Sequence, residues 1–216
     1  MKRVIHIHVP RTAGDSMRSW ARRGPFTYQE LYKINSRFKK KTFDWNPSTD
    51  WTYLGHSSPG GLIEDGTITR GWYLRCFRFA FVRNPWDRLV SVYECLRSEP
   101  RRTRRREWSH LSSFDSFVKC TVLGTSDVTP RFRYRQLPWL KGGMDFIGRY
   151  GRLDEDWKKL CTAVGVKYRP LKRRGIRTSK DGRDFRRCYN RVLRELVATF
   201  YAEEIERFGF KFEEDQ

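Results

Sequence analysis

Twice in this sequence a short apolar run passes through a polar turn directly into a helical pattern. The first run is 3–9 (RVIHIHV), which a Gly-containing turn joins to the helical stretch 16–23. The second run is 76–82 (CFRFAFV), followed by 84–97, where Pro85 suits the first turn of a helix. Strands that alternate with helices form parallel sheets covered by helices. The sequence therefore predicts an α/β, three-layer fold with a central, mainly parallel sheet flanked by helices.

The remaining segments fit the same architecture. A helical pattern is expected over 28–40 and a short aromatic strand over 51–56, which leads into a glycine-rich loop over 57–66. A strand end followed by a helix is expected over 145–166. The core stripe of the last helix is expected to consist of Val192, Leu193, Leu196, Val197, Phe200 and Tyr201.

Length and charge limit the classes of protein to consider. The 216 residues suit one domain spanning 1–216, and 38% apolar content is enough for a core. Lys and Arg number 45 against 25 Asp and Glu, which gives a formal net charge of +20 and favours an anionic partner. Charge alone does not distinguish nucleic acid, an acidic membrane, a phosphate-bearing cofactor and an acidic glycan.

The sequence gives no support for a zinc site, a disulfide framework, a membrane span or a signal peptide. The five cysteines form no close pair, so reduced thiols are predicted in place of a zinc site or a disulfide framework. No stretch approaches the roughly 20 apolar residues that span a bilayer, and no signal peptide is recognised. If the sequence is complete, a cytoplasmic protein is expected. The cysteines are Cys76, Cys95, Cys120, Cys161 and Cys188.

The turn after the first strand has the composition of an anion-binding loop. Gly14 allows close approach of the backbone, Arg11 adds a permanent charge, and Thr12 and Ser16 offer hydroxyl groups. A loop that enters a helix also presents N–H groups and the positive end of the helix dipole. The nucleoside-triphosphate motif G-x-x-x-x-G-K-[ST] is absent. A phosphate-type ligand is predicted, with a plain strand-to-helix turn as the alternative.

The second strand–helix unit offers two further ligands for an anion. Arg83 follows the apolar run, where its guanidinium can hold a phosphate with paired hydrogen bonds. Ser91 is expected about two turns into the following helix. Arg88 is the competing ligand, although a solvated or ion-paired role is favoured for it.

These segments resemble the cofactor-binding motifs of the sulfotransferases. Residues 7–16 (IHVPRTAGDS) are similar to the 5'-phosphosulfate-binding loop of that family. Residues 79–93 (FAFVRNPWDRLVSVY) resemble its 3'-phosphate-binding motif in the version typical of the carbohydrate (family 2) sulfotransferases. The similarity continues through 145–160, 178–189 and 196–213, and so covers nearly the whole chain. It implies a P-loop-like fold and a PAPS-dependent enzyme, which moves the sulfuryl group of 3'-phosphoadenosine 5'-phosphosulfate (PAPS) to an acceptor hydroxyl or amine and leaves PAP.

The resemblance also assigns site residues. Arg83 and Ser91 are expected to hold the 3'-phosphate, whereas the loop around Ser179 and Lys180 matches too loosely to be assigned. The aromatic residue that stacks on adenine is not identified. The residues expected to wrap the 5'-phosphosulfate are Arg11, Thr12, Ala13, Gly14, Asp15, Ser16 and Met17.

Arg11 departs from the family pattern, which ordinarily has lysine at this position. That lysine is thought to stabilise the departing oxygen. Because a guanidinium is a poor proton donor, Arg11 is expected to stabilise the leaving group through charge and paired hydrogen bonds. A catalytically silent binding module is the alternative that this departure leaves open.

His56 is predicted to be the general base. Histidine suits proton transfer near neutral pH, and His56 ends the 51–56 strand at the sheet edge where the cofactor is expected. Related family members have a base histidine in the corresponding Gly-His segment. If His56 instead caps the following turn, Glu64 or Asp65 takes the role.

The other histidines are assigned no catalytic role. His6 and His8 alternate on the first strand, where a packed, hydrogen-bonded role is favoured over metal binding because no further ligand cluster supports a metal. His110 lies in a basic loop and is expected to be solvated. No metal is required for the proposed chemistry.

The acceptor is expected to be a carbohydrate, with an acidic glycan as one candidate, but the sequence does not identify it. The arginine run over 101–106 is either a solvated loop or an attractive surface for an acidic glycan. Two other functions stay open: a small-molecule kinase, which needs ATP and magnesium, and a basic nucleic-acid-binding protein. No recognisable nucleic-acid module supports the latter, so no specific nucleic-acid partner is predicted. The oligomeric state is not predicted.

Overall fold

The computed structural model describes residues 2–24, 27–30, 48–54, 58–98, 113–124, 135–172 and 184–213. The chain forms two compact units. The first, called the sheet unit, comprises Met1–Val82 and Gln136–Arg174. The second, called the helical unit, comprises Arg83–Arg135 and Gly175–Gln216.

The sheet unit is built on five strands in the order β2-β3-β1-β4-β5, and every neighbouring pair is parallel. In the register of the sheet, Val4 lies opposite Trp51 on one side and Phe77 on the other. Because β1 is central, the loop that follows it begins in the middle of the carboxyl edge of the sheet. The strands are β1 (Val4–His6), β2 (Tyr28–Glu30), β3 (Trp51–Tyr53), β4 (Phe77–Val82) and β5 (Phe146–Arg149).

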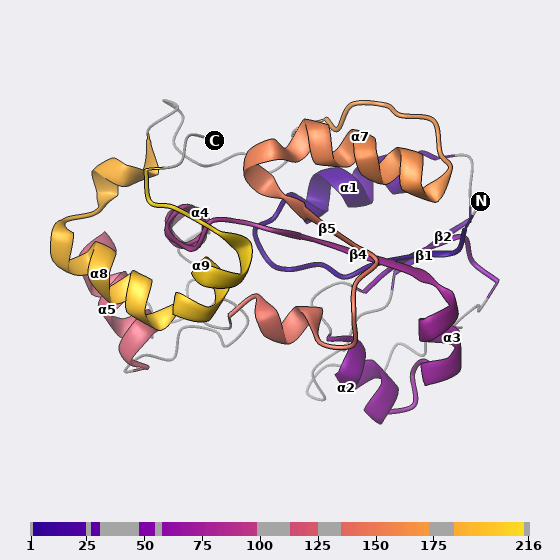
Figure 1. Ribbon diagram of the computed structural model, residues 1–216, viewed down its shortest axis with the longest axis horizontal. Helices are drawn as coiled ribbons and strands as arrows, with labels where there is room; N and C mark the ends of the chain where they lie inside the picture. Colours follow the sequence, from indigo (N-terminus) through magenta and orange to yellow (C-terminus); the bar gives the residue numbers. More distant parts are fainter. Residues whose placement is uncertain are drawn as a thin grey trace. The chain divides into compact units, whose positions relative to one another are not determined.

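Helices cover both faces of this sheet. As Figure 1 shows, α1 (Gly14–Ala21) and α7 (Leu153–Val164) lie on one face, and α2 (Pro59–Glu64) and α3 (Arg70–Arg75) lie on the other. The three layers and the parallel sheet confirm the predicted α/β fold. Two short 3-10 helices, η2 (Leu137–Leu140) and η3 (Tyr150–Arg152), complete the unit.

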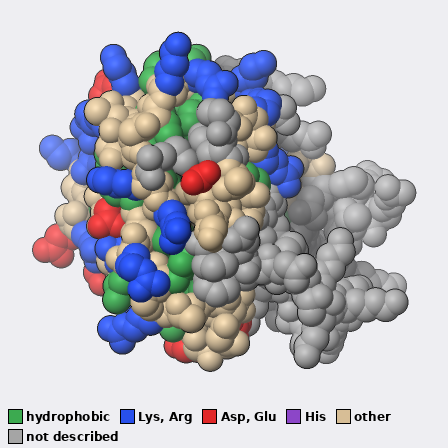
Figure 2. Space-filling model, turned by 90° about the vertical axis from the view of Figure 1, so that its right-hand side faces the viewer, with side chains coloured by type: hydrophobic (Ala, Val, Ile, Leu, Met, Phe, Trp, Pro, Cys, Tyr) green, Lys and Arg blue, Asp and Glu red, His purple; other side chains and the backbone are tan. Residues whose placement is uncertain are grey.

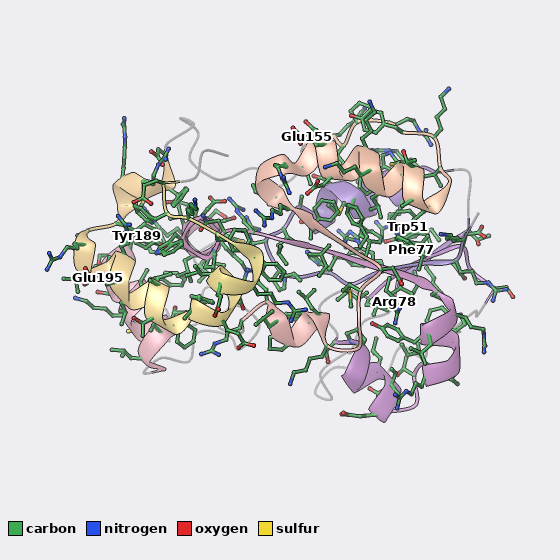
Figure 3. The ribbon with its side chains drawn as sticks, in the orientation of Figure 1. Trp51, Phe77, Arg78, Glu155, Tyr189 and Glu195 are labelled. Atoms are coloured by element: carbon green, nitrogen blue, oxygen red, sulfur yellow. The ribbon has the colours of Figure 1, made fainter. Side chains whose placement is uncertain are left out.

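Tryptophans fill the layer between the sheet and the α1/α7 pair. Trp51, labelled in Figure 3, is fully buried on β3 and packs with Trp20 of α1 and Trp157 of α7. The ring centroids of Trp20 and Trp157 lie 5.0 Å apart in an edge-to-face arrangement, a favoured geometry for aromatic pairs. Burial of such large side chains anchors α1, and with it the loop that precedes α1.

The helical unit has a core of its own. It contains α4 (Pro85–Arg97), α5 (Phe114–Leu123), η4 (Phe185–Cys188), α8 (Arg191–Phe200) and α9 (Ala202–Phe208). Trp86 donates its indole N–H to the Arg194 carbonyl at 3.1 Å. Tyr189, labelled in Figure 3, donates its hydroxyl to the Trp86 carbonyl at 2.8 Å. These bonds hold the start of α4 against η4 and α8.

Two expected elements prove wrong. Residues 28–30 form a strand where a helix was expected, because Tyr28 pairs with Trp51 along β3. Residues 59–64 form the helix α2 where a loop was expected. Ser58 caps this helix by accepting a hydrogen bond from the Gly61 N–H at 3.2 Å, and Pro59 occupies its first turn, so local capping offsets the poor helix propensity of the glycines.

The stripe expected on the last helix is also partly wrong. Leu193 and Val197 of α8 and Tyr201 beyond it are buried, as expected. Leu193, Val197 and Tyr201 are spaced four residues apart and so lie along one side of the helix. Val192 precedes Leu193 by one position, lies on another side and is 63% exposed. The chain also bends after Phe200, where α8 gives way to α9.

The cysteines form no disulfide, as predicted. All five cysteines are free thiols, with Cys76 and Cys161 buried. Among the described residues, no helix combines the length and the apolar character needed to cross a membrane.

Candidate functional site

The loop between β1 and α1 adopts a conformation that L-residues seldom take. Arg11 and Ala13 have φ values of 71° and 68°, both in the left-handed region. Each such residue costs on the order of 1 kcal/mol, so the surrounding structure must impose this shape. Thr12, between them, is fully buried and donates its hydroxyl to the Val9 carbonyl at 2.7 Å. Its side-chain donor thus closes the loop, and its backbone N–H is the group that can reach an anion.

The amino terminus of α1 is suited to an anion. Ala13 is its N-cap residue and, within the described chain, no side chain caps this end of the helix. By contrast, Asn84 accepts a hydrogen bond at the start of α4 and Ser113 at the start of α5. Helix N-terminal N–H groups without a capping side chain bind phosphate and sulfate groups readily. The donors of this turn therefore fit a phosphosulfate group.

The side chains of the first turn divide between core and surface. Ser16 and Met17 are buried, and their N–H groups donate to the Ala13 carbonyl at 3.0 and 3.2 Å. Asp15 is exposed and lies 3.5 Å from the guanidinium of Arg18. Met17 belongs to the apolar core under α1, so its side chain anchors the helix.

The His8 ring packs against Gly14 at the start of α1, a contact that the sequence did not reveal. Its Nδ1 is hydrogen-bonded to the hydroxyl of Tyr53 on β3, and the residue is buried. A Cβ atom added to Gly14 would overlap Nε2, Cδ2 and Cε1 of the His8 ring, with Cε1 the farthest of the three at 2.7 Å. Gly14 is therefore required because the imidazole occupies the space of a side chain.

Replacing Gly14 with alanine is expected to weaken binding of the cofactor product PAP at least tenfold, because the new methyl group must displace either the His8 ring or the start of α1. Titration calorimetry measures this affinity. Gly60→Ala is the matched control, since Gly60 also lies in a first helical turn and a Cβ there meets nothing within 4 Å. Equal affinities of the two variants would contradict the proposed role of Gly14.

His6 is packed, as predicted, but the hydrogen bond expected for it is wrong. It is fully buried, its ring stacks on Phe79 at a centroid distance of 4.6 Å, and neither ring nitrogen makes a hydrogen bond within the described part of the chain. Burial lowers the pKa of His6 to about 3, so the ring is neutral at physiological pH. Among the described residues, no group of three or more His, Cys, Asp or Glu side chains could hold a metal ion.

The second motif lies at the start of the helical unit. Arg83 directly follows the last residue of β4 in the chain and is buried. Its Nε and Nη2 donate to the two carboxylate oxygens of Asp87, the second of these bonds at 2.8 Å. Ser91 is buried on α4, one turn beyond Asp87. Asp87 was not among the predicted site residues, although an acidic residue four positions after a functional arginine could have indicated it.

Arg88, the competing anion ligand, is fully buried. Burial raises the pKa of the nearby Tyr201 hydroxyl to about 12, and the positive charge of Arg88 opposes that shift. A solvated role for Arg88 is therefore wrong, and a role inside the core of the helical unit replaces it.

Several predicted residues lie outside the described residues: His56, the arginines of 101–106, His110, Ser179 and Lys180. The alternatives to His56 are described. Glu64 ends α2 and is exposed, whereas Asp65 accepts hydrogen bonds from the N–H and the hydroxyl of Thr67 at 3.1 and 2.6 Å. These bonds tie the Asp65 carboxylate to its own turn.

Comparison with known proteins decides the family. A family model described as the sulfotransferase family matches residues 4–211. The chain belongs to the sulfotransferase family. It is therefore a member of an enzyme family that uses PAPS, which confirms the resemblance of the two motifs. No curated protein matches the sequence.

The fold of this sulfotransferase is similar to that of a solved relative, mouse sulfotransferase SULT7A1 complexed with PAP. The TM-score is 0.58 over 94% of this chain and 83% of the mouse chain. Sequence identity is 12%, so this similarity shows a shared fold.

Proposed function

We propose that this sulfotransferase moves the sulfuryl group of PAPS to a hydroxyl of a carbohydrate acceptor by in-line displacement. The observation that carries the proposal is the loop over 11–17. There, two left-handed residues and a helix end without a side-chain cap lie in the segment that resembles the family's 5'-phosphosulfate-binding loop. The mouse relative, which was solved with PAP, supports use of the same cofactor.

The proposed ligands belong to the two motifs. The N–H groups of Thr12, Ala13, Gly14 and Asp15, with the Ser16 hydroxyl and the Arg11 guanidinium, would hold the 5'-phosphosulfate, and Met17 would anchor the loop that wraps it. Arg83 and Ser91 would hold the 3'-phosphate. Because the family model runs through both units, we propose that residues 1–216 act as one sulfotransferase domain.

PAPS supplies an activated sulfuryl group. The acceptor oxygen forms a bond to sulfur while the bond from sulfur to the bridging phosphate oxygen breaks. In this scheme His56 takes the proton of the acceptor hydroxyl as that bond forms. Arg11 and the loop N–H groups then stabilise the negative charge that develops on the leaving phosphate. No metal takes part in this scheme.

Arg11→Lys tests the departure from the family pattern. The expected result is a fall in kcat of about tenfold, because a lysine offers one point charge where a guanidinium offers paired, oriented donors. Arg23→Lys, an exposed arginine just after α1, is the control and is expected to retain full activity. A sharp rise in kcat for Arg11→Lys would show instead that arginine is a compromise at this position.

An acidic acceptor would suit the charge of the protein. Figure 2 shows Lys and Arg side chains spread over the described part of one face, with Asp and Glu scattered among them. Replacing the arginines of 101–106 with glutamine is expected to raise KM for a polyanionic acceptor about tenfold at low salt and to leave KM for PAPS unchanged. An unchanged KM for the acceptor would exclude this role.

Transfer of ³⁵S from labelled PAPS to carbohydrates tests the proposed function. A uronate-containing polysaccharide and its carboxyl-reduced, neutral form make a matched pair of acceptors. We expect labelling of the polysaccharide without added metal, and more labelling of the uronate form. Phosphate transfer from ATP with magnesium, in the absence of any sulfuryl transfer, would contradict the proposal.

A further inference from the structure

Asp87 makes the most specific contact in the second motif. Both of its carboxylate oxygens accept hydrogen bonds from the Arg83 guanidinium, one from Nε and one from Nη2. We propose that Asp87 is a positioning residue for the 3'-phosphate: it sets the orientation in which Arg83 meets that group. This inference rests on the proposed function, since it presumes that Arg83 binds the 3'-phosphate of PAPS.

The geometry of the paired hydrogen bonds limits what Arg83 can do. A guanidinium is planar and presents five N–H donors in a fixed arrangement. When Nε and Nη2 face Asp87, the opposite edge of the guanidinium, around Nη1, is the edge directed away from the carboxylate. The carboxylate thus fixes the plane of the guanidinium, and a phosphate that Arg83 binds meets its donors in that fixed orientation.

Asp87 also lies close to the other predicted ligand. Asp87 and Ser91 are both in α4 and four residues apart, so their side chains lie on the same face of the helix. A carboxylate beside a phosphate would normally weaken binding by charge repulsion. The paired hydrogen bonds to Arg83 turn the carboxylate oxygens toward the guanidinium, whose positive charge offsets that of the carboxylate.

The backbone around Asp87 is fixed independently of this pair. Asn84 caps α4 by accepting a hydrogen bond from the Trp86 N–H at 3.1 Å, and its amide group donates to the Lys211 carbonyl at 2.8 Å. The Tyr189 hydroxyl bonds to the Trp86 carbonyl at 2.8 Å. Loss of the Asp87 carboxylate should therefore release the Arg83 side chain while α4 keeps its position.

The test uses the full chain and compares affinities for PAP and AMP, which differ by the 3'-phosphate. The discrimination ratio is the dissociation constant for AMP divided by that for PAP. In Asp87→Asn this ratio is expected to fall about tenfold, because an amide cannot accept both guanidinium hydrogen bonds. Affinity for AMP should be unchanged. Asp115→Asn is the matched control: it also removes a first-turn carboxylate, one that pairs with Lys119 at 2.8 Å on the surface of α5.

A double-mutant cycle shows whether Asp87 acts through Arg83. With Arg83 already replaced by alanine, adding Asp87→Asn should leave the ratio of the AMP dissociation constant to the PAP dissociation constant unchanged. If Asp87→Asn does not fold, Asp87→Glu serves in its place, since it keeps the charge but shifts the paired hydrogen bonds, and the same fall in ratio is expected.

The outcomes separate the two proposals. Wild-type protein that does not distinguish PAP from AMP would overturn the proposed function. Wild-type protein that does distinguish them, with an unchanged or larger ratio in the Asp87 variant, would overturn the positioning role alone. Equal weakening of PAP and AMP in the Asp87 variant would likewise overturn it, because such weakening indicates a purely structural role.

Discussion

Replacing His56 with alanine is expected to lower kcat for sulfuryl transfer by roughly 10²- to 10⁴-fold, the usual contribution of a general base. The neighbouring strand supports this assignment. β3 is parallel to β1, with Tyr53 opposite His6, and the N–H of Leu54 still donates to the His6 carbonyl at 3.0 Å. The last described residues of this segment therefore lie at the carboxyl edge of the sheet, the edge from which the loop that precedes α1 also starts.

The affinity for PAP separates catalysis by His56 from a structural role. If His56 is the base, PAP should bind His56→Ala as tightly as the wild-type protein. His110→Ala is the control, because His110 lies in the basic loop and is expected to retain full activity. Loss of PAP binding in His56→Ala would indicate a structural histidine, and Glu64→Gln would then be the variant that lowers kcat.

Arg83→Ala is expected to weaken PAP binding about 100-fold or more while AMP binding changes little, because charge-assisted hydrogen bonds to the 3'-phosphate are lost. The variant also leaves Asp87 buried without its guanidinium partner. A fall in the free energy of unfolding of about 3 to 5 kcal/mol is expected in the absence of ligand. Calorimetry at low temperature, where the variant stays folded, measures the affinities.

Two further arginine variants sharpen this test. Arg83→Lys keeps the charge but cannot form the paired hydrogen bonds, so an intermediate loss of PAP affinity is expected. Arg97→Ala removes an arginine from the other end of α4, where its side chain is 62% exposed, and should leave both affinities unchanged. Equal loss for Arg83 and Arg97 would mean that only overall charge attracts the cofactor.

Local patterns in the sequence were enough to predict much of the fold. The apolar run 76–82 became β4, and the Asn84-Pro85 pair marked the start of α4 correctly. Such capping and periodicity signals act within one turn or strand, so they can be recognised without tertiary information. The strand at 28–30 was mistaken for a helix because its conformation depends on pairing with β3, a contact that the local sequence does not contain.

Contacts between distant residues account for what the sequence missed at the site. The motifs identified Gly14 as a residue that permits close approach, but the group that approaches is the His8 ring, held by Tyr53 from another strand. Arg83 was predicted as a phosphate ligand, and its partner Asp87 became apparent only when the side chains were in place. In both cases the spacing predicted a site residue, and the fold shows the group that contacts it.

The central claim is that the chain binds a nucleotide through its 3'-phosphate, and one calorimetric experiment tests it most directly. Wild-type protein is titrated with PAP, AMP and ATP in the absence of magnesium. We predict that PAP binds with a dissociation constant on the order of micromolar and far more tightly than AMP or ATP. Equal affinity for PAP and AMP, or tighter binding of ATP, would contradict the claim.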